Sequence, residues 1–414
     1  MRFASMRFCL LALLLAHLCL HATSAGVDAN GPAPVVRSHP PGFQHALTDE
    51  DLQPLFKTCM DPDFAPHDKR VKYQKKPYSL LDLANTVVAQ KRAKYYKHLS
   101  LVVIRQGAMH IATLSPSKMP PSPTPKRIAA MQGAVANATK AGVQFPDCVF
   151  IMSTWDEPRC PLQYPALCTA PIMSIIKQWD PSRKSSIYTD ILVPFFNHFY
   201  EDVVDFPWEL KKNQALMRGA MQNGMSPNNV RLWLVRQSEK PPWPQLLDAG
   251  ITNNLKRGLD ITTVPQVSMP DHARWRFLIS TDGFTASARL GKVLGINSVV
   301  VKEETRWIEH YYRALVPDTH YVGFTRSNAL QVLQDLHKKP DDKLQAIAQA
   351  GQQFQQQYLS QQSKAVYLQK VLQRYVTLFP ASAHPDFVAR LDVTRLTDLS
   401  YLLEQLKIPA AIAR

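Results

Sequence analysis

Short apolar runs alternate along the chain with segments of helical periodicity. The apolar runs predict buried strands at 149–154, 214–217, 276–280, 298–301 and 320–324. Apolar residues at helical spacing predict a helix over 287–294 and two longer helices beyond Pro340, at 344–358 and 365–378. Short buried strands separated by helices indicate an α/β fold in which parallel sheets are covered on both faces.

One pair of strands is expected to form a hairpin. The segment 101–107 begins with an apolar run and ends in a predicted turn at Gln106-Gly107, and a second apolar run follows at 109–114. The proline-rich segment 116–125 that follows predicts a loop or linker.

The first 25 residues predict a secretory signal peptide. Arg2 and Arg7 precede the apolar run 8–20, and small residues from Ala22 offer a cleavage site near Ala25. An uncleaved anchor in the secretory membrane is the alternative. No later window holds about 18 consecutive apolar residues, so no stable membrane span is expected after cleavage.

Two further features concern the mature chain. Residues 26–56 hold several Pro and Gly without periodicity and predict a mobile tail. Asn137-Ala-Thr139 is a sequon that a secreted protein could carry glycosylated. We therefore expect a glycoprotein in the lumen of the endoplasmic reticulum or Golgi, or a secreted one.

Composition narrows the class of protein. The 414 residues include 45% hydrophobic and 20% charged residues, which is typical of two or three globular domains and excludes a disordered chain. The formal net charge is +15. The segment 57–97 is rich in Lys, Arg and Tyr, a pattern also found in nucleic-acid-binding proteins. A lumenal protein rarely meets nucleic acid, so we interpret this segment as a solvated helical face that favours acidic acceptors or anionic membranes, and expect no nucleic-acid partner.

Four cysteines remain after the leader: Cys59, Cys148, Cys160 and Cys168. The strand 149–154 carries the chain about 20 Å from Cys148, and the residues up to Cys160 can return only about 14 Å. A disulfide needs Cα atoms within about 7 Å, so a Cys148–Cys160 bridge is not expected. We favour Cys160–Cys168 with Cys59–Cys148; buried free thiols are the alternative.

Asp156 is the first candidate for catalysis. It lies just past the predicted strand 149–154, where α/β folds place ligands, and Trp155 and Pro158 restrict the backbone beside it. A carboxylate there could act as a general base. The alternative is an Asp that caps a turn.

Two segments are candidates for binding an anionic donor. Arg218-Gly219 ends a predicted strand, and an arginine there suits a diphosphate, although a surface arginine in a turn has the same pattern. The segment 282–289 joins a strand to a helix and offers free N–H groups, the Ser287 hydroxyl and the Arg289 guanidinium; a plain capped helix is the alternative. The candidate donor-binding residues of this segment are Asp282, Phe284, Thr285, Ala286, Ser287, Ala288 and Arg289.

Lys302 and Glu309 complete the candidate donor site. Lys302 follows a predicted strand, and Glu309 is expected on a following helix, where it could accept hydrogen bonds from a ribose. The alternative is surface charge beside a core of Trp307 and Tyr311. No Gly-rich phosphate-binding fingerprint and no HExxH motif is present, and we expect no metal and no cofactor.

Taken together, these segments resemble the CAP10-like family 90 glycosyltransferases, which include protein O-glucosyltransferases. The resemblance runs from about residue 101 to 379 and is densest at 277–290, "FLISTDGFTASARL". It includes further short matches at 190–194, 207–208, 217–219, 247–249, 298–302, 309–312, 315–322 and 348–354.

The resemblance implies a GT-B-like α/β fold, in which two Rossmann-like domains with parallel sheets face a cleft. We place the acceptor-side domain at 57–205, the donor-binding domain at 206–340, and C-terminal helices at 341–414 packing back across the cleft.

The resemblance also implies inverting, metal-independent transfer from a UDP-sugar. Asp156 matches the family's catalytic Asp, and Arg218 with 284–289 matches its donor-diphosphate contacts. Two departures stand out: Met217 replaces the usual aromatic residue, and the family's protein-acceptor contacts have no clear match. We expect glucose or xylose to be transferred to a hydroxyl of a protein or glycan. The alternative is a sugar-binding or scaffold protein of this fold without turnover; a hydrolase is disfavoured because no second carboxylate pairs clearly with Asp156.

Overall fold

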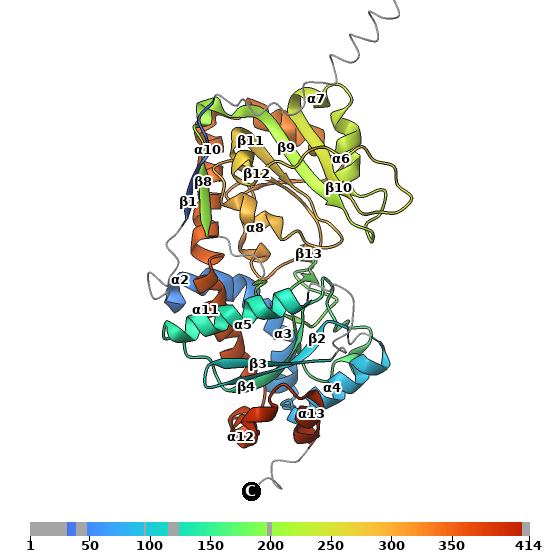
Figure 1. Ribbon diagram of the computed structural model, residues 1–414, viewed down its shortest axis with the longest axis vertical. Coiled ribbons are helices and arrows are strands. Elements are labelled where there is room, and N and C mark those ends of the chain that lie inside the picture. Colours follow the sequence, from blue (N-terminus) through green and yellow to red (C-terminus); the bar gives the residue numbers. More distant parts are fainter. Residues whose placement is uncertain (1–30, 39–47, 95–96, 115–123, 197–200, 408–414) are drawn as a thin grey trace, which may run out of the picture.

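The computed structural model describes residues 31–38, 48–94, 97–114, 124–196 and 201–407. The predicted signal peptide 1–25 lies outside these residues, as does most of the proline-rich segment 116–125. Figure 1 shows two α/β units, one above the other in the view, each built on its own sheet. The predicted α/β class with two sheet-containing units is therefore confirmed.

The first unit contains a five-stranded sheet of order β3-β2-β4-β5-β7. Its strands are β2 (Leu99–Arg105), β3 (Ala108–Thr113), β4 (Cys148–Ser153), β5 (Ile172–Ser174) and β7 (Ile191–Leu192). The predicted hairpin is confirmed as β2–β3, and its tight turn makes these two strands antiparallel. Because β2 also runs antiparallel to β4, only β4, β5 and β7 are parallel, and the expectation of a parallel sheet was wrong for β2 and β3.

The second unit contains a fully parallel sheet of order β10-β9-β11-β12-β14. Its strands are β9 (Lys212–Met221), β10 (Leu247–Asn254), β11 (Trp275–Ser280), β12 (Val299–Glu303) and β14 (Val322–Phe324). The predicted strands at 214–217, 276–280, 298–301 and 320–324 are present. The carboxyl ends of parallel strands share one edge, which is where the candidate donor residues collect.

Helices cover both sheets. They are α4 (Leu80–Arg92) and α5 (Thr124–Lys140) in the first unit, and α6 (Val230–Ser238), α7 (Trp243–Leu246), α8 (Arg289–Leu294) and α9 (Ala329–Lys338) in the second. Asn137 is exposed on α5, so the sequon lies in a helix; its glycosylation stays a prediction. No helix within the described ranges combines the length and the apolar character that crossing a bilayer requires.

The C-terminal helices run along both units (Figure 1). They are α10 (Asp341–Tyr358), α11 (Gln361–Val376), α12 (Ala383–Arg390) and α13 (Leu399–Lys407). Helix α10 packs on α8 and β12 of the second unit, whereas α11 packs on α5, α12 on β4 and α13 on α4 of the first unit. These helices therefore connect the two units.

The N-terminal segment contains more structure than predicted. Within the expected mobile tail 26–56, β1 (Val35–Ser38) pairs with β8 (Asp202–Asp205), and α2 (Asp49–Leu55) begins after a capping box between Thr48 and Asp51. The prediction was wrong at these positions because local hydrogen bonds and strand pairing order a segment that lacks periodicity. Helix α3 (Asp61–Asp68) lies between π-helical turns at Phe56–Met60 and Lys69–Tyr73.

One of the two predicted disulfides is present. Cys160 and Cys168 are bonded, whereas Cys59 and Cys148 are free and buried, which contradicts the predicted second bridge. The ring of Phe56, in the turn that contains Cys59, lies 6.2 Å from the Tyr367 ring, whereas the carbonyl oxygen of Val149, next to Cys148, accepts a hydrogen bond from the Tyr375 hydroxyl at 3.4 Å. These tyrosines lie about 12 Å apart along α11 by helical rise, so the two thiols face different turns of that helix.

Candidate functional site

Asp156 follows the carboxyl end of β4, as predicted. Its Oδ1 lies 2.8 Å from Nη2 of Arg127 on α5, and 33% of the Asp156 side chain is exposed. Arg127 also donates a hydrogen bond to the Thr154 carbonyl oxygen. The loop therefore holds a carboxylate that is fixed on one side and open to an incoming hydroxyl.

The residues beside Asp156 restrict its loop further. The Trp155 ring stacks on His98 at a centroid distance of 4.0 Å and an interplanar angle of 7°. The indole Nε1 donates to Glu157 Oε2 at 3.3 Å. Burial, followed by the charges of Arg159 and Arg127, lowers the pKa of His98 to about 4, so the stacked imidazole is neutral at pH 7.

Arg218 lies inside β9 rather than at its end, because pairing with β10 continues to Met221. Its Nη1 is 2.8 Å from Asp248 Oδ1, and its Nη2 donates to Asp248 Oδ2 at 2.9 Å. The structure therefore corrects the predicted position of Arg218 and of Gly219, and it gives the Arg218 guanidinium a bidentate carboxylate partner on β10.

Arg289 begins α8, two residues later than the predicted helix start. Ala288 precedes the helix without a side-chain cap, and the Ser287 carbonyl oxygen accepts a hydrogen bond from Tyr312 at 3.2 Å. The Arg289 Nη1 donates to the Arg218 carbonyl oxygen, which brings the two predicted donor elements together. Because α8 is only six residues long, its N-terminus adds little charge, and the side chain carries the site.

The electrostatic environment of Arg289 is dominated by other arginines. Burial, followed by the like charges of Arg231 and Arg218, lowers the pKa of Arg289 to about 10. Among the described residues, no carboxylate forms an ion pair with Arg289. A half-buried cation surrounded by cations is a favourable position for an anionic ligand.

Arg231 on α6 is a residue that the sequence analysis missed. Its Nε donates to Thr281 Oγ1 at 3.1 Å, its Nη2 to the Thr281 carbonyl oxygen at 3.2 Å, and its Nη1 to the Ala220 carbonyl oxygen at 2.8 Å. These bonds join the carboxyl ends of β9 and β11. A Cβ on Gly219 would lie 3.1 Å from the Arg231 Cδ. The glycine that follows Arg218 in the sequence was therefore the available signal that another side chain packs closely against this strand.

The segment 282–289 forms the rim of the same edge. The Asp282 amide donates to Glu303 Oε2 at 3.0 Å, and Thr305 donates from its hydroxyl to Asp282. Burial raises the pKa of Asp282 to about 6 and that of Glu303 to about 7, the second helped by the Asp282 charge. At neutral pH these two carboxyls therefore compensate the neighbouring arginines only in part.

Apolar and small residues fill the rest of the segment. Phe284 is exposed and its amide donates to Gln222 Oε1 at 3.3 Å, while Thr285 is buried and its carbonyl oxygen accepts from the Gly283 amide at 2.9 Å. Ala286 and Ala288 pack against the hydrophobic core. The backbone of this predicted segment lies at the carboxyl-terminal edge of the parallel sheet, which is the candidate donor edge, and the ligand contacts of its individual residues stay predictions.

Lys302 and Glu309 differ from their predicted positions. Lys302 lies inside β12, and its Nζ donates to the Glu303 carbonyl oxygen at 3.0 Å. Glu309 is not helical, because the chain before it forms β13 (Trp307–Ile308), which pairs with β6 (Lys177–Gln178) of the first unit. Only 1% of Glu309 is exposed, and neither carboxylate oxygen has a hydrogen-bond partner in the described part of the chain.

Glu309 connects the two halves of the candidate site. Burial raises its pKa to about 7; the Lys364 charge opposes this rise, and those of Asp282 and Asp156 add to it. Glu309 therefore lies within electrostatic range of both the donor edge and the candidate base. Among the residues that the structure describes, no group of three or more His, Cys, Asp or Glu side chains is arranged to hold a metal ion.

Comparison with known proteins identifies a matching family. Residues 194–388 match the family model described as Glycosyl transferase family 90. The resemblance to family 90 is confirmed. The matched segment covers the whole second unit, helices α10 and α11, and most of α12.

Protein O-glucosyltransferases from several animals are similar to this chain over part of their length. Protein O-glucosyltransferase 2 of Danio rerio is 33% identical over 177 residues, which are 41% of this chain and 34% of the relative. Protein O-glucosyltransferase 1 of Homo sapiens is 27% identical over 264 residues, 56% of this chain and 63% of the relative. O-glucosyltransferase rumi of Drosophila melanogaster is 29% identical over 188 residues, 44% of both chains. The matches thus span between a third and two thirds of these relatives.

Among solved structures, the Anabaena protein Alr3699/HepE in complex with UDP-glucose has a TM-score of 0.30 and 12% sequence identity. The match covers 42% of this chain and 57% of that chain. A TM-score this low carries no argument about the donor or the site of this chain.

Proposed function

We propose that the chain is a glycosyltransferase that moves a sugar from a UDP-sugar to a hydroxyl group. The observation that carries this proposal is the half-buried Arg289 guanidinium, which lies near Arg218 and Arg231 and has no carboxylate partner in the part of the chain that the structure describes. The two phosphates of a UDP-sugar would supply the missing negative charge. The family 90 match supports the same reading.

Asp156 acts as the general base in this proposal. Its carboxylate takes the proton of the acceptor hydroxyl while the acceptor oxygen attacks the anomeric carbon of the sugar. The bond from that carbon to the diphosphate oxygen breaks, and UDP leaves with the electron pair. Attack from the face opposite UDP inverts the anomeric configuration. Arg127 keeps the Asp156 carboxylate in place on the side away from the acceptor.

Charge that develops on UDP is stabilised by guanidinium groups. Arg289 donates hydrogen bonds to the diphosphate directly. Arg218 and Arg231 stabilise the neighbouring strands through their own hydrogen bonds and add positive potential at the diphosphate. Because cationic side chains already stand at the leaving group, we propose that transfer proceeds without a metal ion. We further propose that Glu309, whose carboxylate oxygens have no hydrogen-bond partner among the described residues, accepts hydrogen bonds from hydroxyl groups of the donor.

We propose glucose as the first sugar to test, since the relatives are named O-glucosyltransferases, and xylose as the second. The acceptor is a hydroxyl of a protein or glycan in the lumen of the secretory pathway. The Cys160–Cys168 disulfide supports that compartment, because disulfides persist in oxidising lumens.

A panel of UDP-sugars tests the proposal. The purified protein is incubated with each sugar nucleotide, with and without EDTA, and the release of UDP is measured. We expect release from at least one UDP-sugar that survives EDTA and is lost in Asp156→Asn. UDP binding without release from any donor would instead favour a sugar-binding protein of this fold, and strict dependence on added Mn²⁺ would contradict the metal-independent mechanism.

A further inference from the structure

We propose that a rigid rim beside Asp156 is the docking surface for an acidic segment of a polypeptide acceptor. The acceptor rim consists of Leu162, Tyr164 and Ile187, together with the adjoining pocket that contains Trp179, Arg183 and Arg306. The inference rests on the proposed function, because it names the class of acceptor that the same site would use.

Three large apolar side chains of the acceptor rim are exposed. Leu162 is 55%, Tyr164 59% and Ile187 60% exposed. The Leu162 amide donates to the Ile187 carbonyl oxygen at 2.8 Å, so the two segments run side by side. Neighbouring exposed apolar residues of this size are typical of protein interaction surfaces.

The pocket beside Ile187 is positively charged. The Arg183 and Arg306 guanidiniums lie 3.8 and 3.6 Å from the same Asp180 carboxylate, and their side chains stay 82% and 71% exposed. One carboxylate therefore faces two accessible guanidiniums, whose planar donors suit the carboxylates of a partner. The net charge of +15 also attracts an acidic partner to the molecule.

The disulfide loop that carries Leu162 and Tyr164 is fixed at its start. Cys160 and Cys168 are bonded, and the Asp190 carboxylate accepts hydrogen bonds from the amides of Arg159 and Cys160, both at 2.8 Å. The Gln90 side chain donates to the Arg159 carbonyl oxygen at 3.1 Å. Each contact restrains the backbone rather than the exposed side chains.

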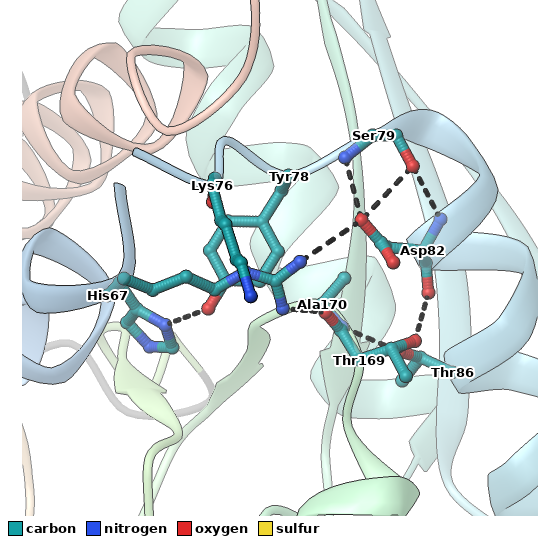
Figure 2. Close-up of polar contacts among 9 residues, drawn as sticks. His67, Lys76, Tyr78, Ser79, Asp82, Thr86, Thr169 and Ala170 are labelled. Atoms are coloured by element: carbon teal, nitrogen blue, oxygen red, sulfur yellow. Dashed lines mark hydrogen bonds and ion pairs between the residues drawn. The ribbon is translucent and has the colours of Figure 1, made fainter. Parts of the chain in front are cut away.

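The far end of the loop is fixed by a second network (Figure 2). The Arg70 guanidinium lies 4.0 Å from the centroid of the Tyr78 ring and donates to the Thr169 carbonyl oxygen at 3.0 Å. The Thr169 hydroxyl donates to the Asp82 carbonyl oxygen on α4 at 2.8 Å. A surface that is already ordered binds a partner without the cost of ordering its own loop.

Chain connectivity places the acceptor rim near the reacting groups. Leu162 is the first rim residue along the chain and follows Asp156 by six residues, which limits the separation of their Cα atoms to about 21 Å. At the opposite end of the rim, Arg306 follows Thr305 in the chain, and Thr305 donates a hydrogen bond to Asp282. Three residues after Arg306 comes Glu309, whose pKa is raised in part by the Asp156 charge. A polypeptide bound along the rim would therefore reach the candidate base with a nearby hydroxyl.

Two fluorescein-labelled synthetic peptides test the proposal with the full chain. Both contain one Ser and one Leu; one carries three Asp residues, which the other replaces with Asn. We expect fluorescence anisotropy to report at least about tenfold tighter binding of the acidic peptide, since bonds between charged groups are lost with Asn. The Arg183→Ala/Arg306→Ala and Leu162→Ser variants should each weaken this binding about tenfold or more.

Matched controls come from exposed positions of the second unit. Leu210 is 52% exposed and Lys343 is an exposed residue of α10, so Leu210→Ser and Lys343→Ala should bind the acidic peptide as the wild type does. Equal binding of the two peptides, no binding of either, or wild-type binding by the rim variants would overturn the proposal. The rim variants could instead lose binding to phosphatidylserine vesicles while they bind the acidic peptide as the wild type does. That result would overturn the proposal and identify the rim as a membrane-binding surface.

UDP titration separates this inference from the proposed function. The rim variants should keep wild-type affinity for UDP, because the acceptor rim lies outside the donor edge. A protein that binds the acidic peptide but not UDP would contradict the proposed transferase and leave the docking surface in place.

Discussion

A single carboxylate and a single guanidinium carry most of the proposed chemistry. Asp156 is exposed on one side and fixed by Arg127 on the other, whereas Arg289 is half-buried among like charges. The first suits a group that takes a proton from an incoming acceptor, and the second suits a group that holds an anionic donor. Each role predicts a different effect of mutation.

Replacing Asp156 with Asn should remove the base and preserve the shape of the loop. We expect transfer to fall by about 10²- to 10⁴-fold, the usual contribution of a general base, while UDP affinity stays nearly unchanged. Steady-state kinetics and UDP titration on the same preparation measure both quantities. Glu157→Gln is the control, and normal turnover in Asp156→Asn would remove this residue from the mechanism.

Replacing Arg289 with Ala should weaken UDP binding and also slow transfer, because the diphosphate is anionic before the reaction and gains charge as UDP leaves. Arg289→Lys should recover only part of the loss, since an ammonium cannot reproduce the bidentate geometry of a guanidinium. Calorimetric titration of UDP compares the variants.

Arg276→Ala serves as the matched control for the arginine series, because Arg276 pairs with Asp341 at the start of α10 instead of facing the donor edge. Wild-type UDP affinity in Arg289→Ala would contradict the assignment of the donor site.

Individual elements position these side chains, and some could be predicted more closely than others. The apolar runs located β4, β9, β11, β12 and β14 because burial on both faces leaves a continuous apolar signal. The turn at Gln106-Gly107 likewise identified the β2–β3 hairpin. The resemblance and the predicted strands together placed Arg218 and Arg289 in one donor-binding region. In the structure the Arg289 guanidinium donates a hydrogen bond to the Arg218 carbonyl oxygen.

Long-range pairing explains what the sequence could not predict. The extension of β9 to Met221 depends on its neighbour β10, and the non-helical setting of Glu309 depends on pairing of β13 with β6, about 130 residues earlier in the chain. Arg231 was missed because its hydrogen-bonding partners, Ala220 on β9 and Thr281 just after β11, are distant from it in the sequence. The absent Cys59–Cys148 bridge likewise depends on the packing of both segments against α11.

Helix α4 offers a test at the scale of an element. Ser79 caps α4 through a capping box with Asp82, and the Asp82 carbonyl oxygen accepts from Thr169 in the network of Figure 2. Ser79→Ala should lower the free energy of unfolding by about 1 kcal/mol, as for the loss of other N-caps. Ser382→Ala is the control, because Ser382 precedes α12 without a side-chain capping bond. Equal losses in the two variants, measured by urea denaturation, would contradict the capping role.

Four histidines, three of them buried and His98 half-buried, couple the stability of the whole molecule to pH. Burial lowers the pKa of three of them to about 4 (His67, His98 and His272) and that of His384 to about 3. The folded state thus binds fewer protons than the unfolded state below the ordinary pKa of 6.5. Their contribution is full above pH 6.5 and is lost as the pH falls toward 4.

Calorimetry across pH tests this coupling. We expect Tm to fall by roughly 5 °C or more between pH 7 and pH 5, because the unfolded chain then takes up protons that the folded chain excludes. His384→Gln should flatten this dependence relative to the wild type, since Gln cannot titrate. A Tm that stays constant or rises over the same interval would contradict the assignment of neutral buried imidazoles.

A buried charge cluster joins the N-terminal segment to both units. The Asp63 carboxylate lies 2.6 Å from the Lys177 ammonium and 2.7 Å from the Arg313 guanidinium, and all three side chains are buried. Asp63→Asn would leave two buried cations without a counter-ion and should cost about 3–5 kcal/mol of stability. Chemical denaturation measures the loss, with the exposed Asp342→Asn as control. A change no larger than that of the control would show that water or another anion neutralises the cluster.

The central claim is that Arg289 and its neighbours form a site for the diphosphate of a UDP-sugar. The most direct test is isothermal titration calorimetry of UDP and of uridine into the full-length protein, with EDTA present. The account predicts that UDP binds and that uridine binds at least about 100-fold more weakly, because uridine lacks the phosphates that would contact the guanidinium. Equal affinity for the two ligands, or no binding of UDP, would contradict it.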